Sequence, residues 1–113
     1  MAQDIRLTTT VAKVLRAFLE DVDRPRYGYD LMEDTGLASG TLYPILLRLQ
    51  KAGILTAEFE DIDEAKEGRP ARRFYTLTPD GTARARVSMA ELHAQIWGSP
   101  QRSWRLSPEG GMA

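Results

Sequence analysis

The sequence contains no cysteine among its 113 residues. A disulfide framework, a thiolate metal site, a cysteine nucleophile and redox chemistry by the chain itself are therefore excluded. Histidine is nearly absent too, since His93 is the only one, and neither a carboxylate pair nor a glycine-rich phosphate loop accompanies it. We therefore expect a protein that is not an enzyme and that needs no metal or cofactor.

Long apolar runs are also missing, and the N-terminus begins with the polar residues Gln3, Asp4 and Arg6. Neither a membrane-spanning helix nor a secretory signal peptide is expected, which predicts a cytoplasmic protein. Apolar residues make up 42% of the chain and charged residues 27%, a balance typical of a folded globular protein. The length allows one compact domain and leaves no room for a second.

Positive charge is not in excess, because the formal net charge is −1. Any binding to nucleic acid must then depend on local clusters of cations and not on the charge of the whole protein. One such cluster follows an acidic stretch: residues 58–67 hold six acids and one lysine, and Arg69, Arg72 and Arg73 come directly afterwards.

Three helices are predicted in the first half of the chain. The first starts at the capping threonines 8–10 and ends near Asp23, ahead of Pro25, and its apolar face comprises Val11, Val14, Leu15, Phe18, Leu19 and Val22. The second spans about 27–35 and ends at Gly36. The third spans about 39–52, with Leu42, Ile45, Leu46 and Leu49 inward; Pro44 lies inside it and predicts either a later start or a bend.

The pattern then changes to alternation, which predicts strands at about 54–60 and 73–78 joined by a polar loop with Gly68 and Pro70. Three helices followed by a β-hairpin describe a winged helix-turn-helix over residues 1–78, a mainly helical fold with a small β-hairpin. Winged helices bind either DNA or other proteins, so the fold alone leaves both functions open.

Thr78 and Pro79 begin a last helix, over residues 79–98. It carries two opposed apolar stripes, one with Ala83, Val87, Ala90, Ala94 and Trp97 and the other with Ala85, Met89, Leu92 and Ile96. One domain can cover only one stripe, so the other is expected to contact a second copy of the chain. The tail at 99–113, rich in glycine and proline, is expected to be partly mobile.

Candidate DNA contacts lie in the third helix and in the hairpin. Small hydroxyls and backbone N–H groups at the start of that helix suit phosphate and base-edge contacts, and arginines at a narrow tip suit phosphates or a minor groove. Simpler roles stay open: Ser39 could cap the helix, Tyr43 could pack on the hairpin, Arg48 could be solvated, and Arg69 and Arg72 could pair with the acids upstream. The candidates are Ser39, Gly40, Thr41, Tyr43, Pro44, Arg48, Lys66, Arg69 and Arg72.

The stretches YGYDLMEDTGLASGTLYPILLRLQKAGIL and GRPARRFYTLTPDG, within residues 27–81, resemble the PadR family of bacterial winged-helix regulators. The family's Gly-Thr-Leu-Tyr-Pro run stands at residues 40–44 and its Gly-Arg-Pro wing at residues 68–70. The resemblance implies a dimeric transcription factor, usually a repressor, of the short subgroup with a single C-terminal helix. It assigns Ser39, Thr41 and Tyr43 to the recognition helix and Arg69 to the wing.

The resemblance also implies that the last helix makes most of the dimer contact, with help from the first. The expected interface comprises Val11, Val14, Phe18, Val87, Met89, Ala90, Leu92, Ile96 and Trp97. Small aromatic or phenolic effectors relieve many short members of the family, and Trp97 could stack on such a ligand, although packing in the interface is the simpler role for it. The alternative function is a winged-helix protein-interaction module that binds no DNA.

Overall fold

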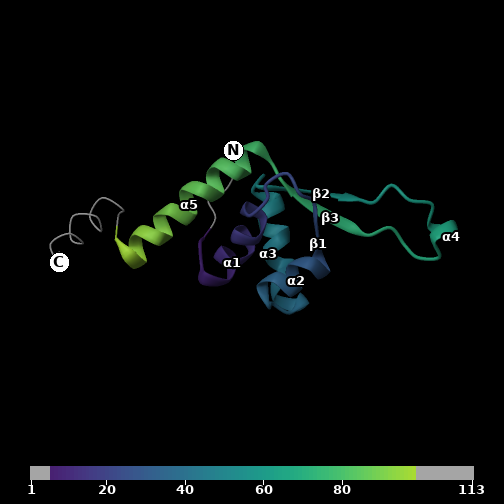
Figure 1. The fold of residues 1–113 in the computed structure, drawn as a ribbon, viewed down its shortest axis with the longest axis horizontal. Coiled ribbons are helices and arrows are strands. Elements are labelled where there is room, and N and C mark those ends of the chain that lie inside the picture. Colours follow the sequence, from purple (N-terminus) through teal and green to yellow (C-terminus); the bar gives the residue numbers. More distant parts are fainter. Residues whose placement is uncertain (1–5, 99–113) are drawn as a thin grey trace.

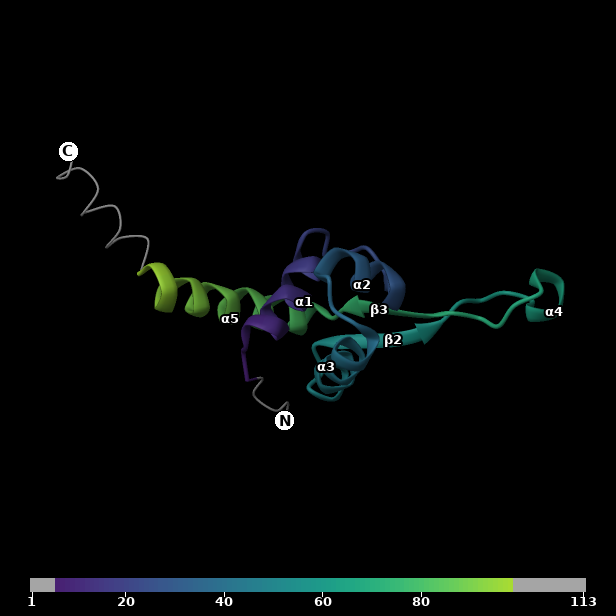
Figure 2. The same ribbon diagram turned by 90° about the horizontal axis from the view of Figure 1, so that it is seen from below.

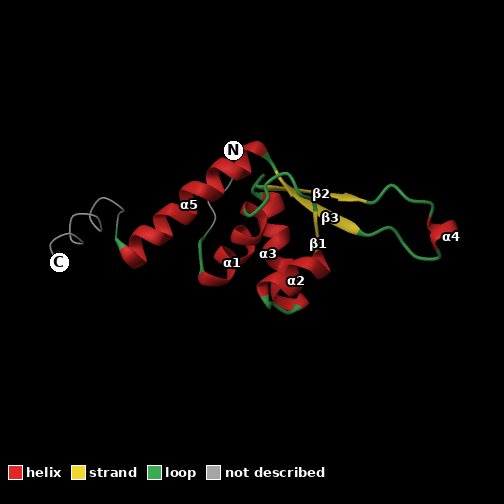
Figure 3. Cartoon of the chain, in the orientation of Figure 1, coloured by secondary structure: helices red, strands yellow, loops and turns green. Residues whose placement is uncertain are grey.

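The computed structural model describes residues 6–98, so the predicted tail at 99–113 lies outside the described residues. Within them the chain is mainly helical, as the sequence predicts, and the predicted hairpin is part of a small three-stranded sheet (Figures 1 and 3). No helix in this part of the chain is long and apolar enough to cross a membrane. The elements are α1 (Thr9–Leu19), β1 (Arg26–Tyr27), α2 (Gly28–Thr35), α3 (Ser39–Lys51), β2 (Leu55–Phe59), α4 (Glu64–Glu67), β3 (Arg73–Leu77) and α5 (Pro79–Trp97).

The core lies between α1, α2, α3 and the sheet, with Ala85 of α5 closing one side. The four residues predicted to face inward from α3 are all buried, which confirms the phase of that helix. Periodic apolar faces thus meet one another in a single cluster. Its members include Val11, Val14, Leu15, Phe18, Leu31, Leu42, Leu46, Leu49, Leu55 and Tyr75.

The sheet has the order β1-β3-β2, and both pairs of strands are antiparallel. Strands β2 and β3 form the predicted hairpin, with Leu55 opposite Leu77 and Phe59 opposite Arg73. We call residues 55–77 the wing and residues 60–72 the wing tip. Strand β1 was not predicted, because two residues carry no periodicity and pair only with a strand almost fifty residues later.

Arg26 of β1 is the one buried charged residue in the described core, with 1% of its surface exposed. Its Nη1 donates to the backbone oxygen of Ala17 at 2.7 Å, and its Nη2 pairs with the carboxylate of Asp34. Burial lowers the pKa of this guanidinium, which still stays charged at neutral pH. Arg26 therefore links α1, β1 and α2.

The end of α1 and the wing tip differ from the predictions, whereas α3 begins at the predicted residue. Helix α1 ends at Leu19 and not near Asp23, because the chain turns through residues 20–24 before Pro25 and then enters β1. Helix α3 begins at Ser39 and keeps Pro44 inside it, since that proline removes only one hydrogen bond near the start. The wing tip contains the unpredicted helix α4, which Asp63 caps with hydrogen bonds from the N–H groups of residues 65 and 66.

Helix α5 is attached by its N-terminal part, as far as Met89, and then projects from the helical core, away from the wing (Figures 1 and 2). Thr78 caps it as predicted and also donates from Oγ1 to the backbone oxygen of Gly53 at 2.8 Å. Gly81 approaches the chain so closely that an added Cβ would lie 2.2 Å from the oxygen of Ile54. Arg84 donates to the oxygen of Ala52, which ties α5 to the end of α3.

Candidate nucleic-acid interface

The first two turns of α3 present the predicted contact residues to solvent. Ser39, Gly40, Thr41, Tyr43 and Pro44 are all exposed there. The N-cap residue is Ala38, and no side chain caps this helix, so Ser39 does not have the capping role left open by the sequence. The first backbone N–H groups of a helix have no partner within it, and they carry the positive end of its dipole. This end of α3 can therefore receive an anion.

Tyr43 packs back against α2. The ring lies against Gly28, where an added Cβ would sit only 1.9 Å from the Tyr43 hydroxyl oxygen. Glycine at the first position of α2 thus makes room for the tyrosine. The Tyr43 side chain remains 43% exposed, so it reaches solvent beside the start of α3.

A cavity of about 350 Å³ opens between α2, the start of α3 and the wing strand β3. We call it the tyrosine cavity, because all four tyrosines of the chain line it. No acidic side chain is among the residues that line it, whereas two arginines are. Its lining comprises Tyr27, Gly28, Tyr29, Met32, Tyr43, Arg72, Arg73 and Tyr75.

Aromatic rings hold both of these arginines at the rim. The guanidinium of Arg72 lies 5.5 Å from the ring centre of Tyr29, which itself stacks on Tyr27 at 5.6 Å. The guanidinium of Arg73 lies 5.8 Å from the ring centre of Tyr75. Such contacts fix the position of a cation and leave its N–H groups able to bind an anion.

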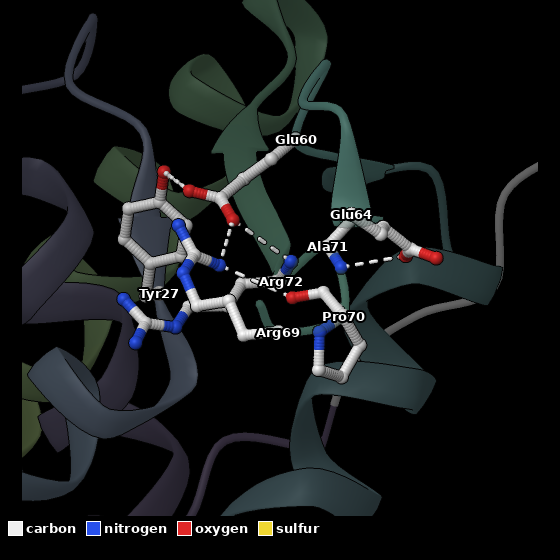
Figure 4. Close-up of polar contacts among 7 residues, drawn as sticks. All are labelled: Tyr27, Glu60, Glu64, Arg69, Pro70, Ala71 and Arg72. Atoms are coloured by element: carbon white, nitrogen blue, oxygen red, sulfur yellow. Dashed lines mark hydrogen bonds and ion pairs between the residues drawn. The ribbon is translucent and has the colours of Figure 1, made fainter. Parts of the chain in front are cut away.

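The wing tip is organised by the carboxylate of Glu60 (Figure 4). Its Oε1 accepts from Nη1 of Arg69 at 2.7 Å and from the backbone N–H of Arg72 at 2.9 Å. Its Oε2 accepts from the hydroxyl of Tyr27 at 3.1 Å. The hydrogen bonds from Arg69 and Arg72 lower the pKa of Glu60 to about 2, so the carboxylate is charged throughout the neutral range.

The predicted DNA contacts are thus brought together only in part. Tyr43 and Arg72 line one cavity, and Arg69 is joined through Glu60 to Tyr27 beside it. Arg48 is exposed two turns from the start of α3, and Lys66 is exposed in α4 at the far end of the wing (Figure 1). The sequence left open whether Arg69 and Arg72 pair with the acids upstream. Arg69 does form such an ion pair, with Glu60.

Sequence reasoning missed several residues of this surface. Tyr27 and Tyr29 flank the glycine that admits Tyr43, and their presence in the stretch YGY was the available sign. Leu47 is 49% exposed on α3, between the predicted contacts and Arg48, although its neighbours Leu46 and Leu49 are buried. An apolar side chain in that position can contact a thymine methyl group in a major groove.

The residues expected at a dimer interface separate into two groups. Val11, Val14 and Phe18 are at most 2% exposed and belong to the protomer's own core, so their side chains offer no surface to a second chain. That part of the expected interface is corrected, because periodicity identifies an apolar face without saying what covers it. Met89 also packs partly against the core, and Leu92 is half-buried. The exposed members lie in α5: Val87, Ala90, Ile96 and Trp97.

Three packed helices, the third of them with an open N-terminus, and a β-hairpin beside them define a winged helix-turn-helix protein. A profile of the transcriptional regulator PadR-like family matches residues 17–87, which is more than half of the chain. The protein belongs to this family, whose members are transcription regulators and not enzymes. No protein with a curated function matches the chain.

Solved structures show the same fold. The protein smu.1704 from Streptococcus mutans UA159 is 26% identical, with a TM-score of 0.62 over 77% of this chain and 78% of that one. A PadR-like transcription factor from Bacteroides fragilis is 23% identical, with a TM-score of 0.56 over 76% of this chain and 88% of that one. Overoxidized AbfR bound to DNA is 21% identical, with a TM-score of 0.62 over 94% of this chain and 71% of that one.

Proposed function

We propose that the protein is a sequence-specific DNA-binding repressor, in which α3 enters the major groove and the wing contacts the flanking backbone. The observation that carries this proposal is the open N-terminus of α3, whose exposed hydroxyl and amide groups lie beside the arginine-lined tyrosine cavity. A similar fold is bound to DNA in AbfR, which supports the same use here. Thr41 and Arg48 are seven residues apart on α3 and so share its exposed face, where both can reach one groove.

We further propose that the protein acts as a homodimer on a two-fold symmetric operator. In helix α5 the distal half leaves Ile96 58% and Trp97 68% exposed, which is a large apolar surface for a small domain. A second copy of the same helix would cover it by an isologous contact. The two α3 helices would then enter successive major grooves roughly 34 Å apart.

Selection from a randomised duplex library in about 100–150 mM salt tests the DNA-binding proposal, because nonspecific attraction to phosphate is weak at that ionic strength. We expect an inverted repeat to be enriched. On that duplex, Thr41→Val should lower the affinity, whereas the control Thr9→Val, exposed at the start of α1, should not. A folded dimer that enriches no sequence would contradict the proposal and favour a protein-interaction module.

The dimer is tested by sedimentation velocity on Ile96→Lys. A lysine in a buried apolar contact would lose its hydration, so we expect this variant to be monomeric. Gln95→Lys is the matched control, because the same charge is added one residue earlier, at an exposed polar position of the same helix. Equal dissociation by both variants would contradict an interface through Ile96.

We propose that a small aromatic or phenolic effector relieves repression by binding at Trp97 in the dimer interface. The hydrogen bond from Arg84 to Ala52 supplies a route, because a displacement of α5 would be transmitted to the C-terminal end of α3. Titration with 4-hydroxybenzoate should quench the fluorescence of the protein and weaken operator binding over the same concentration range. Trp97→Phe should remove both effects; if operator affinity stays constant while the ligand binds, the effector role is wrong.

A further inference from the structure

Glu60 joins three separate parts of the DNA-binding surface. It stands just after β2 and contacts Arg69 in the middle of the wing tip, Arg72 directly before β3 and Tyr27 at the start of α2. The backbone N–H of Glu60 also donates to the oxygen of Arg72 at 2.9 Å. Its side chain is 15% exposed, less than the 31% of Arg69, so Glu60 is the less accessible partner of this ion pair.

The ion pair with Glu60 limits which N–H groups of Arg69 can contact DNA. Its Nη1 is occupied by Glu60 and by the backbone oxygen of Pro70, at 2.7 and 3.1 Å. No hydrogen bond joins Nη2 or Nε to the described part of the chain. The guanidinium is therefore oriented, with one edge held and the other available, and its charge is balanced by the carboxylate.

An arginine balanced in this way attracts a phosphate only weakly from a distance, and it releases few counterions when it binds one. It can still donate hydrogen bonds from its available edge to an acceptor that the rest of the interface brings to the right place. A free arginine on a mobile tip would instead bind any phosphate within its reach.

We propose that Glu60 is a positioning residue that determines specificity: it orients Arg69 for the operator and suppresses its attraction to DNA of any other sequence. This inference rests on the proposed DNA-binding function. Discrimination depends on the difference between two affinities, so weakening the nonspecific contact raises specificity as effectively as a new operator contact. The low pKa of Glu60 supports the idea, because the carboxylate stays charged at every physiological pH.

The test compares Glu60→Gln with the wild-type protein on the selected operator and on a random duplex of equal length, across a series of salt concentrations. Releasing the charge of Arg69 should add one phosphate contact on random DNA. The slope of log K against log salt should then steepen by about 0.9, and the affinity in 0.1 M salt should rise roughly eightfold. Operator affinity should rise less than random-duplex affinity, so the ratio of the two affinities falls.

Glu58→Gln is the matched control, because it removes the same charge from an exposed position two residues earlier on β2. The double variant Glu60→Gln/Arg69→Gln should lose the gain on random DNA. Arg69→Gln alone leaves the Glu60 carboxylate unpaired, so its negative charge should weaken binding to both duplexes. Operator binding should fall about tenfold further than random-duplex binding, because only the operator loses an oriented hydrogen bond from Arg69. This comparison tests the idea even if Glu60→Gln folds poorly.

The inference is overturned if Glu58→Gln reproduces the gain, if operator and random affinities rise by the same factor, or if Arg69→Gln weakens both duplexes equally. In each of these cases the wild-type protein still binds its operator, so the proposed function stands. A wild-type protein that binds no duplex overturns the proposed function and this inference together.

Discussion

Replacing Gly40 by alanine separates the stability of α3 from its contact with DNA. Gly40 is the second residue of α3, and an added Cβ there would have no atom within 4 Å apart from its immediate surroundings in the helix. The methyl group therefore meets open space in the free protein. If DNA lies against this turn, as we propose, the same methyl group meets the duplex.

The two effects have opposite signs. Alanine in a helix is favoured over glycine by about 0.5–1 kcal/mol, because the unfolded chain loses less conformational freedom. For a domain of this size that gain raises Tm by roughly 3–6 °C. An additional methyl group in a closely packed contact costs about 1–3 kcal/mol, which corresponds to a loss of operator affinity of roughly tenfold, since 1.4 kcal/mol is a factor of ten.

Thermal unfolding and operator binding of the same Gly40→Ala sample measure both quantities. Gly81→Ala is the contrasting variant, because its Cβ would lie 2.2 Å from the backbone oxygen of Ile54 and must force α5 away from the chain. We expect Gly81→Ala to lower Tm. A lower Tm for Gly40→Ala would refute the reasoning about free space, and an unchanged operator affinity would show that the first turn of α3 does not face DNA.

Three further outcomes are expected. Gly28→Ala should displace the Tyr43 ring and weaken operator binding while Tm changes little, because the clash is with the end of a half-exposed side chain. Arg26→Met should lower the free energy of unfolding in urea by about 1–3 kcal/mol, since the buried backbone oxygen of Ala17 loses its donor; unchanged stability would contradict that role. The folded-state pKa of Glu60 lies near 2, below its ordinary 4.5, so its stabilising contribution is present above pH 4.5 and is lost as the pH falls toward 2. In acid titrations followed by thermal unfolding, Glu60→Gln should lack this component, and an identical pH profile would count against it.

Local patterns in the sequence predicted most of the secondary structure. The threonine caps at residues 8 and 78 are confirmed, because a cap bonds to N–H groups only three residues away. The phase of α3 is confirmed for the same reason, since its inward residues follow the helical repeat. Strand β1 could not be predicted, because its existence depends on pairing with β3 across a long stretch of chain.

The candidate site was predicted as a set of residues but not as an arrangement. The sequence allowed Arg69 either to be free for DNA or to pair with an upstream acid, and it did not say which acid. The choice of Glu60 follows from the register of the hairpin, which places Glu60 beside Arg72 and the returning chain. The involvement of Tyr27 depends on the packing of α2 against the wing, which no local pattern encodes.

The sequence by itself determined the fold class of the protein, because periodicity, caps and turn residues act over a few positions. These local signals were sufficient to specify the helices and the hairpin. Only the tertiary structure decided what covers each apolar face and which charges are paired. Val14 faces the protomer's own core, whereas Ile96 faces solvent, although both stand in apolar stripes of amphipathic helices. Burial and ion pairing depend on contacts between segments distant in sequence, and those contacts exist only once the chain has folded.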